Sequence, residues 1–331
     1  MKRTILFITS FVLFTSLGFS QKEYDGNDII EMDNGLWTEK FSDEPITGKV
    51  YGGFGEKGNL KKVYIGNLLN GKKEGKWVSY YHSTGRKKTD ENYKDGKRNG
   101  LRTEWYENGQ KELKGTFKDG KFDGKRTFWY ENGQKQSEVT YKDGKPVGLV
   151  TIWYENGQKL SHNTYKNGEK DGLWTKWYEN GQNQSEGTYK DGKQDGLFTM
   201  WYENGQKQSE GTYKDGKQDG LFTMWYDNGK KWIEGKYNYN DGKRNGLRTE
   251  WYENGQKKEV SNFKDGEQDG LFTMWYENGK KKFEGNFKDG KEHGIQTLWY
   301  ENGQKSIEVT HKDGRRISSK GWNEDGSEVQ K

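Results

Sequence analysis

The dipeptide Trp-Tyr recurs along the chain at an almost constant interval, and this repetition limits the fold more than any other feature of the sequence. Successive copies lie 24 residues apart, with one longer step of 26 residues where two extra residues stand near Tyr237. The tryptophans are Trp105, Trp129, Trp153, Trp177, Trp201, Trp225, Trp251, Trp275 and Trp299. A period of this length is typical of a tandem array in which each unit contacts its neighbours.

One unit, residues 197–220, contains two segments with the alternation of β-strands and two turn signals. Residues 197–202 alternate with β-branched and aromatic side chains, and Asn204-Gly205 then predicts a hairpin, because both residues tolerate positive φ. Residues 207–214 form the second segment, which ends at Asp215-Gly216. No window has the 3.6-residue period of a helix. The sequence therefore predicts an all-β fold, an elongated antiparallel array of β-hairpins with about 20 strands.

Comparison of the copies separates recurring positions from variable ones. The recurring Leu-x-Thr-x-Trp residues, represented by Leu197 and Trp201, share one face of the first strand, and Gly211 and Tyr213 recur on the second strand. We expect a three-residue turn that gathers these recurring residues on one face and places Leu197 opposite Tyr213. A two-residue turn would instead place Trp201 opposite Gln208.

The positions between the recurring ones differ from copy to copy, and several carry large apolar side chains. If they face solvent, they form an apolar stripe, and such stripes suggest a surface for a partner. A second, thinner packing layer or self-association would use the same residues. The candidate residues of this partner-binding face are Trp174, Phe198, Met200, Phe222, Met224, Phe272 and Met274.

The composition fits a folded array, although only 28% of residues are hydrophobic and 32% are charged. That balance is usual in disordered chains, but an aromatic content of 15% is not. The 47 glycines and 2 prolines fit a chain rich in turns. The net charge of +5 is spread over interleaved lysines and acids, so we expect no nucleic acid as a partner.

No combination of residues predicts a catalytic residue, a cofactor or a metal site, and we expect the protein not to be an enzyme. The chain has no cysteine, and its 4 histidines each stand at a different place in the repeat. They are His82, His162, His293 and His311. The recurring Lys-Asp-Gly-Lys turn lacks the alternating acids of a calcium loop.

Two recurring features are interpreted as structural. The pairs Glu203/Lys207 and Glu210/Lys214 are expected to be solvated ion pairs between strands. Rows of Trp and Tyr could stack sugars or bases, but the same rows are the main core that this composition offers.

The N-terminal 20 residues are the one strongly apolar segment of the chain. They begin with Lys2 and Arg3 and carry the small residues Gly18 and Ser20 before Gln21. This order is typical of a cleaved secretory signal peptide, since the apolar run is short for a bilayer span. We expect export to the periplasm, the cell surface or the medium.

The predicted domains follow from the repeat and from the degenerate copies at its two ends. They are a signal peptide at 1–20, degenerate repeats or a cap at 21–71, the 24-residue repeats at 72–315 and a truncated repeat or cap at 316–331.

The pattern Gly-x-aromatic, Lys-Asp-Gly-Lys-x-x-Gly and Trp-Tyr-x-Asn-Gly, as at residues 210–229, resembles the bacterial variant form of the MORN repeat. The resemblance covers about residues 72–315. It implies an elongated hairpin array that binds proteins or lipids or holds partners in place. Bacterial chains of this kind are commonly grouped as YwqK-like antitoxin components, which implies a toxin as one partner.

Together these observations predict an exported, non-catalytic module that binds or scaffolds another protein through one face of an extended sheet. Two alternatives stay open: a module for cell-wall glycans or membrane surfaces that uses aromatic rows, and an antitoxin or immunity partner of a toxin. The oligomeric state is left open by these patterns.

Overall fold

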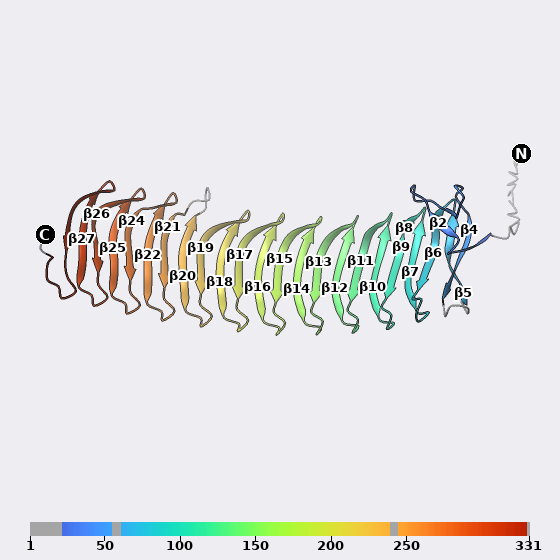
Figure 1. Ribbon diagram of the computed structural model, residues 1–331, viewed down its shortest axis with the longest axis horizontal. Helices are drawn as coiled ribbons and strands as arrows, with labels where there is room; N and C mark the ends of the chain where they lie inside the picture. Colours follow the sequence, from blue (N-terminus) through green and yellow to red (C-terminus); the bar gives the residue numbers. More distant parts are fainter. Residues whose placement is uncertain (1–21, 55–60, 239–243, 330–331) are drawn as a thin grey trace, which may run out of the picture. The chain divides into compact units, whose positions relative to one another are not determined.

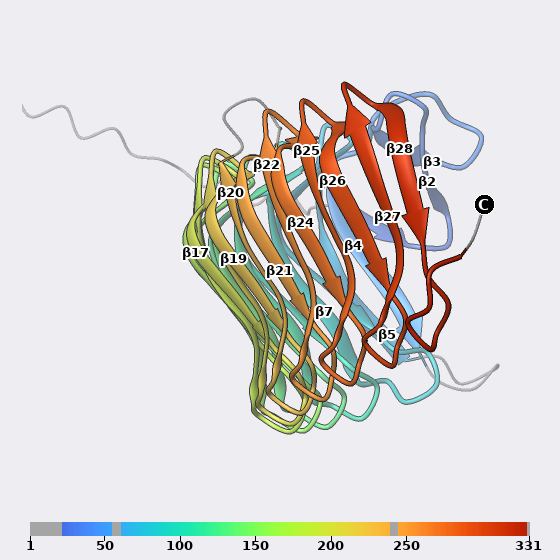
Figure 2. The same cartoon turned by 90° about the vertical axis from the view of Figure 1, so that its left-hand side faces the viewer.

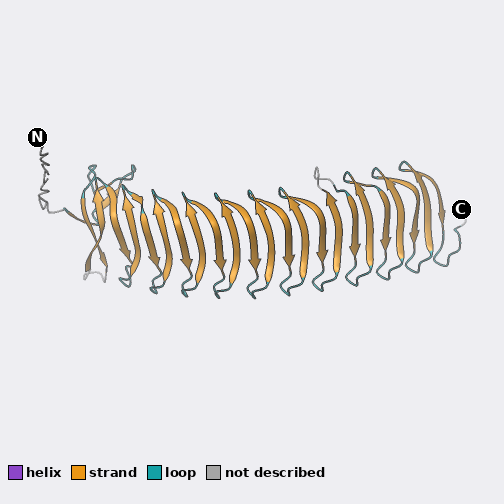
Figure 3. Ribbon diagram, turned by 180° about the vertical axis from the view of Figure 1, so that it is seen from behind, coloured by secondary structure: helices purple, strands orange, loops and turns teal. Residues whose placement is uncertain are grey.

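The computed structural model describes residues 22–54, 61–238 and 244–329, and the chain divides into two compact units, residues 1–109 (unit 1) and residues 110–331 (unit 2). Within the described ranges every regular element is a β-strand (Figure 3). Those ranges hold no helix long and apolar enough to cross a membrane. The predicted all-β class is therefore confirmed, while the predicted signal peptide lies outside the described residues.

The described part of unit 1 contains nine strands and a compact hydrophobic cluster. β1 pairs in parallel with β4, β2 and β3 form a separate hairpin, and the strands from β4 onward pair antiparallel in chain order. The strands are β1 (Glu23–Asp25), β2 (Ile29–Glu31), β3 (Trp37–Glu39), β4 (Gly48–Phe54), β5 (Lys61–Leu69), β6 (Lys72–Tyr80), β7 (Lys87–Lys94), β8 (Lys97–Arg98) and β9 (Gly100–Trp105).

The cluster in unit 1 is a conventional core. Val50 and Leu68 are fully buried, and Trp77 packs beside them with its indole Nε1 donating to the Asn67 carbonyl at 3.0 Å. The Trp77 ring lies over Gly66, where a Cβ atom would come within 2.3 Å of it. Glycine at this position therefore lets a large ring approach the backbone.

A charged group lies beside this core. The Glu91 carboxylate accepts hydrogen bonds from the Tyr93 hydroxyl at 2.7 Å and from Arg98 Nε at 2.9 Å. Burial acts to raise the pKa of Glu91, but these hydrogen bonds and the nearby Arg102 charge lower it overall. Burial and the bond to Glu91 raise the pKa of Tyr93 to about 12.

Unit 2 is a meander in which the strands pair antiparallel in chain order (Figure 1). The strands are β10 (Lys111–Lys118), β11 (Lys121–Trp129), β12 (Lys135–Lys142), β13 (Lys145–Trp153), β14 (Lys159–Lys166), β15 (Glu169–Trp177), β16 (Asn183–Lys190), β17 (Lys193–Trp201), β18 (Lys207–Lys214), β19 (Lys217–Trp225), β20 (Lys231–Asn238), β21 (Gly246–Trp251), β22 (Lys257–Lys264), β23 (Glu267–Gln268), β24 (Gly270–Trp275), β25 (Lys281–Lys288), β26 (Lys291–Trp299), β27 (Lys305–Lys312) and β28 (Arg315–Gly321). The predicted hairpin meander is confirmed. Figure 2 shows that its strands curve along their length, so the sheet of unit 2 is bent and not flat.

The two turn signals of the repeat form different turns. Asp215 and Gly216 both have positive φ, 51° and 80°, and join β18 to β19 as the two residues between a paired Lys214 and Lys217. This is the geometry of a type I′ hairpin turn. At the other turn only Gly205 has positive φ. The hairpin predicted at Asn204-Gly205 is present, but it is not closed by a type I′ turn.

The Asn-Gly loop is wider than the Asp-Gly turn. Its side chains bind both their own loop and the next repeat. The Gln206 N–H donates to Asn204 Oδ1 at 2.9 Å, while Asn204 Nδ2 donates to the Asp227 carbonyl of the following repeat at 2.8 Å. The Tyr202 hydroxyl donates to the Trp225 carbonyl at 2.8 Å. Each such bond contributes about 1 kcal/mol to stability. These bonds give a physical reason why Tyr-x-Asn-Gly recurs in every clear copy.

The preferred strand register was wrong by one residue. Phe198 pairs with Gly211, and Leu197 pairs with Thr212 and not with Tyr213. Most of each strand pairs in the register that a two-residue turn would give. A bulge at the end of the strand then accommodates the wider loop. A slip of one residue moves every side chain to the other face of a sheet. The recurring residues are therefore divided between two faces.

We name the two faces of unit 2 after their most prominent side chains. In the repeat at residues 197–220, the aromatic face carries Phe198, Met200, Gly211 and Tyr213. The leucine face carries Leu197, Thr199, Trp201, Glu210 and Thr212. The variable candidate residues thus share a face with the recurring Gly and Tyr residues.

Candidate functional site

The aromatic face of unit 2 carries a continuous row of rings across neighbouring strands. The ring centroids of Trp174 and Tyr189 are 5.5 Å apart, those of Tyr189 and Phe198 6.4 Å, and those of Phe198 and Tyr213 6.1 Å. Tilted and edge-to-face pairs at such distances are favourable. Variable residues therefore alternate with recurring tyrosines in one row.

Glycines leave the space in which the rings of this row lie. A Cβ atom at Gly187 would come within 2.1 Å of Phe198 Cδ2, and one at Gly211 within 2.8 Å of Phe222 Cδ2. Neither glycine has positive φ, so the ring alone explains the need for glycine. The rings are held flat on the backbone and are only partly exposed.

Two methionines lie on the same surface, and Met200 is its exposed member. Met200 lies between Ser185 and Ser209 on the neighbouring strands and is 37% exposed, and Met224 lies one repeat further along. Unbranched methionine side chains adapt to different partners. The methionines can therefore change rotamer on contact while the rings beside them stay fixed.

Five of the seven predicted residues lie on three consecutive repeats of one surface, which we call the aromatic strip. Its members are Trp174, Phe198, Met200, Phe222 and Met224. The other two, Phe272 and Met274, lie on the same face beyond an intervening repeat, where the Phe272 ring contacts Phe283 at 5.5 Å and Phe287 at 6.0 Å. The predicted residues thus form two apolar patches and not one stripe.

The intervening repeat has charged residues in the same places. Arg248 Nη1 lies 2.8 Å from Glu259 Oε1, and Arg248 also pairs with Glu250, which is buried. Lys258 lies 3.5 Å from Glu250, and the Ser261 hydroxyl donates to Glu259 at 3.2 Å. This charged cluster was not predicted from the sequence. The signal was present, because Arg-x-Glu at 248–250 replaces the Phe-x-Met of other copies.

Lys170 adjoins the other end of the aromatic strip. Lys170 Nζ lies 3.5 Å from the centroid of the Trp174 ring and 4.9 Å from that of Tyr189. Burial, with a smaller effect from Lys176, lowers the pKa of Lys170. A cation over an aromatic face is stabilised by the ring quadrupole, so the strip ends in positive charge at this repeat.

On the leucine face the ion pairs differ from the predicted ones. Lys207 pairs with Glu210 at 2.5 Å and lies over the Trp225 ring at 5.7 Å from its centroid. The expected pairs, Glu203 with Lys207 and Glu210 with Lys214, are wrong. The bulge at the end of the loop brings Lys207 and Glu210, which lie three residues apart on β18, to the same face, where they pair. These contacts recur along unit 2 and cover the tryptophan rings.

The recurring leucines are much more exposed than expected. Seven side chains in successive repeats are 45% to 55% exposed, and we call them the leucine row. The row consists of Leu149, Leu173, Leu197, Leu221, Leu247, Leu271 and Ile295. These positions were expected to lie among the recurring core residues, because the expected register joined them to the tyrosines.

The histidines take part in separate local contacts. His162 packs against the Trp177 ring at 6.4 Å and reaches the Thr151 hydroxyl at 3.3 Å, and burial lowers its pKa. His311 Nε2 lies 3.1 Å from Glu292. Within the described ranges no group of three His, Asp or Glu side chains has a geometry that could hold a metal ion.

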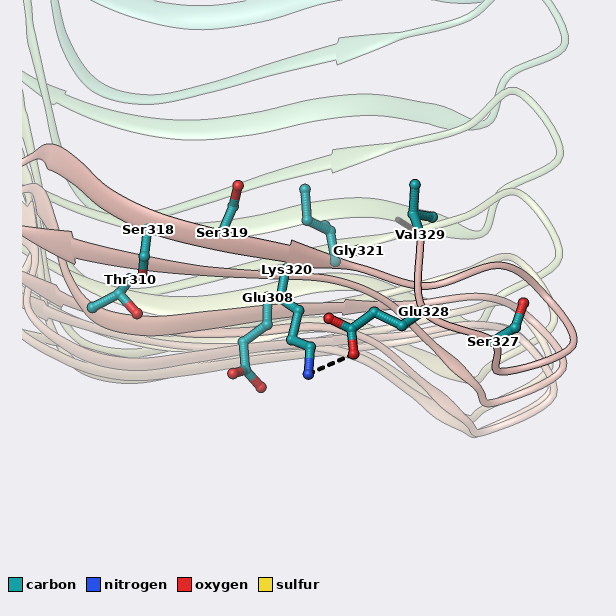
Figure 4. A pocket seen from close by; sticks show the side chains of 10 residues that line it. Glu308, Thr310, Ser318, Ser319, Lys320, Gly321, Ser327, Glu328 and Val329 are labelled. Carbon is teal, nitrogen blue, oxygen red and sulfur yellow. Dashed lines mark ion pairs between the residues drawn. The ribbon is translucent and has the colours of Figure 1, made fainter. Parts of the chain in front are cut away.

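A hollow lies at the C-terminal edge of unit 2, away from the predicted residues. It has a volume of about 1090 Å³ and is lined by β27, β28 and residues 327–329 (Figure 4). Glu308 and Lys320 point to one side of the ribbons and Ser319 to the other, and Lys320 pairs with Glu328 at 2.7 Å. Val329 N–H donates to the Gly321 carbonyl at 2.9 Å, so the chain folds back on the outer edge of β28.

The hairpins repeat one pattern, are joined to each other by hydrogen bonds from Tyr and Asn, and differ in sequence on one face. These features define a β-hairpin repeat protein. The chain belongs to the MORN repeat variant family. Nine segments match that family and together cover more than half of the chain. They are residues 98–119, 122–143, 146–167, 170–191, 194–215, 218–239, 244–265, 268–289 and 292–313. No curated protein matches the chain.

Solved structures that match are much larger proteins of low identity. One is the crystal structure of TcdB2-TccC3, with 11% identity, a TM-score of 0.19 and coverage of 78% of this chain and 17% of that one. Another is a Tc holotoxin pore of Photorhabdus luminescens, with 13% identity, a TM-score of 0.19 and coverage of 82% and 16%. The chain spans about a sixth of the length of these structures.

Proposed function

We propose that the protein is an exported, non-catalytic binding or scaffolding module, and that a protein partner docks on the aromatic strip of unit 2. Export is proposed from the signal-peptide pattern of residues 1–20. The single observation that carries the binding proposal is the position of the variable residues. They lie side by side on one face, held by a frame that is almost the same in every repeat.

The chemistry of the strip supports a protein as the partner. Aromatic rings and methionines are enriched in protein interfaces. The rings of Trp174, Phe198 and Phe222 are ordered by their contacts with neighbouring rings and glycines, so they lose little entropy on binding. Met200 and Met224 supply adaptable contacts beside them. The charged repeat at Arg248 gives the strip a polar boundary that can contribute to specificity.

The test replaces one repeat of the strip with residues that the chain already uses in that place. The double variant Phe222→Arg/Met224→Glu gives residues 221–225 the sequence found at 247–251. It should fold, because Arg248 and Glu250 pair with each other in that frame. We expect at least a tenfold loss of partner in affinity capture from the native host, analysed by mass spectrometry in separate envelope and cytoplasmic fractions. A tenfold loss corresponds to about 1.4 kcal/mol.

A matched control changes an exposed residue at the start of the same strand. Lys217→Glu copies Glu169, which occupies this position in another repeat, and it should leave capture of the partner unchanged. Equal capture by the wild type and the double variant would rule out the strip as the docking surface. Recovery of a polysaccharide or of lipid in place of a protein would favour the glycan or membrane alternative. Recovery of a toxin from the cytoplasm would favour an antitoxin role and argue against export.

A further inference from the structure

The leucine row presents a second apolar surface, on the face opposite the aromatic strip. Its seven side chains stand in seven successive repeats, about 9.6 Å apart because each repeat adds two strands. Across the neighbouring strands the leucines alternate with polar residues: Leu197 pairs with Thr212 and Leu173 with Thr188, while Leu221 pairs with Lys236. The leucines therefore form a regular row and not a set of scattered surface residues.

We propose that two copies of this chain associate through their leucine rows, antiparallel and about a two-fold axis at Leu221. This interface is separate from the partner surface proposed above and does not depend on it. The two copies meet face to face, as the sheets of a β-sandwich do.

The exposed area is of the size that a dimer needs. A leucine that is half exposed leaves on the order of 80 Å² of apolar surface in water, so seven give roughly 550 Å² per copy. A standard interface buries about 800 Å² per partner, including its polar rim. The rim is available here, because Thr212 and the Lys207–Glu210 pair lie on the same face.

The spacing and the ends of the row favour a second copy over a different partner. A second copy has the same spacing by construction, so each leucine meets another leucine along the whole row. The row is bounded by Lys125 at one end and by Ser318 at the other, and Leu221 is its central member. Antiparallel pairing about Leu221 therefore places the polar ends against each other. Such an isologous contact closes on itself and leaves no further row exposed.

The chain itself shows which substitution breaks the row without breaking the fold. Lys125 stands in the leucine position of its own repeat and pairs with Glu138 at 2.8 Å. Glu210 has the same relation to Leu197 that Glu138 has to Lys125. A lysine at Leu173, Leu197 or Leu221 is therefore compatible with the strand pairing, because each of these leucines has a glutamate in this relation.

The first experiment is sedimentation velocity of the full chain over a concentration series. We expect dimers, and we expect the triple variant Leu173→Lys/Leu197→Lys/Leu221→Lys to raise the dimer dissociation constant at least about a hundredfold. The variant should keep the circular dichroism spectrum of the wild type. Lys125→Leu lengthens the row by one repeat and should lower the dissociation constant. A monomeric wild type, or dimers unaffected by the triple variant, would overturn the proposal.

The second experiment fixes the orientation of the two copies. The chain has no cysteine, so Leu221→Cys provides a single thiol near the proposed axis. Opposed sheets lie about 10 Å apart, so a short bis-maleimide should link two Leu221→Cys chains in high yield. Leu149→Cys should not link to itself, because Ile295 of the other copy lies opposite it. Equal cross-linking at both positions, or binding of the row to lipid vesicles by a monomer, contradicts the antiparallel dimer.

Discussion

Replacement of Gly187 by valine should destabilise unit 2 by about 3 kcal/mol, the upper end of the range for overpacking a well-packed site. The reason is the ring of Phe198, which would lie 2.1 Å from even the first added carbon. The ring has little room to move, because Tyr189 and Tyr213 contact it at 6.4 Å and 6.1 Å. Urea unfolding followed by tryptophan fluorescence measures the loss.

The chain contains the compensating change. Two repeats earlier, the positions of Gly187 and Phe198 are held by Val139 and Val150, which are 5% and 8% exposed. The double variant Gly187→Val/Phe198→Val should therefore recover most of the stability, with a coupling free energy of about 2 kcal/mol between the two positions. If the destabilising effects of Gly187→Val and Phe198→Val simply add, then Gly187 does not provide the space for the Phe198 ring, which contradicts this account of the packing in the aromatic strip.

Replacement of Arg248 by leucine should also cost about 3 kcal/mol. It would leave the carboxylates of Glu250 and Glu259 close together, with Lys258 at 3.5 Å as the partner of the first. Removal of one member of a buried ion pair costs about 3–5 kcal/mol, because the remaining charge stays buried. The lower value applies here, since the side chains of Arg248 and Glu259 are each 20% exposed. Chemical unfolding of the variant and the wild type gives the difference.

A triple variant tests whether the charges themselves are needed. Arg248→Phe/Glu250→Met/Glu259→Phe gives this repeat the residues of the next one, Phe272, Met274 and Phe283. It should be within about 1 kcal/mol of the wild type, because apolar replacement of a whole buried ion cluster is often neutral. It would also join the two apolar patches. A triple variant as unstable as Arg248→Leu would mean that the charges stabilise this repeat in a way that packing cannot replace.

The fold was predictable from sequence because its signals are local and repeated. The 24-residue period, the alternation of side chains and the Asp-Gly turns identify an antiparallel hairpin meander without any long-range information. The role of Tyr202 and Asn204 in holding the following repeat was not predictable in this way. Those bonds join residues 23 positions apart, and only the folded array brings them together.

The faces were less predictable, because they depend on a single residue of register. The strands pair one residue away from the expected register, and this separates Leu197 from Tyr213. The choice of seven variable residues was made from differences between copies, which do not depend on register. The exposed leucine row and the cluster around Arg248 were missed, since both require knowledge of which side chains share a face and what lies beside them.

The central claim is that the variable residues of the aromatic strip contact a partner protein. The most direct measurement is site-specific photo-cross-linking in the native host, with benzoylphenylalanine in place of Met200 and, as a control, in place of the exposed Lys214. We expect a discrete adduct with one host protein at Met200 and none at Lys214. No adduct at Met200, or the same adducts at both positions, would contradict the claim.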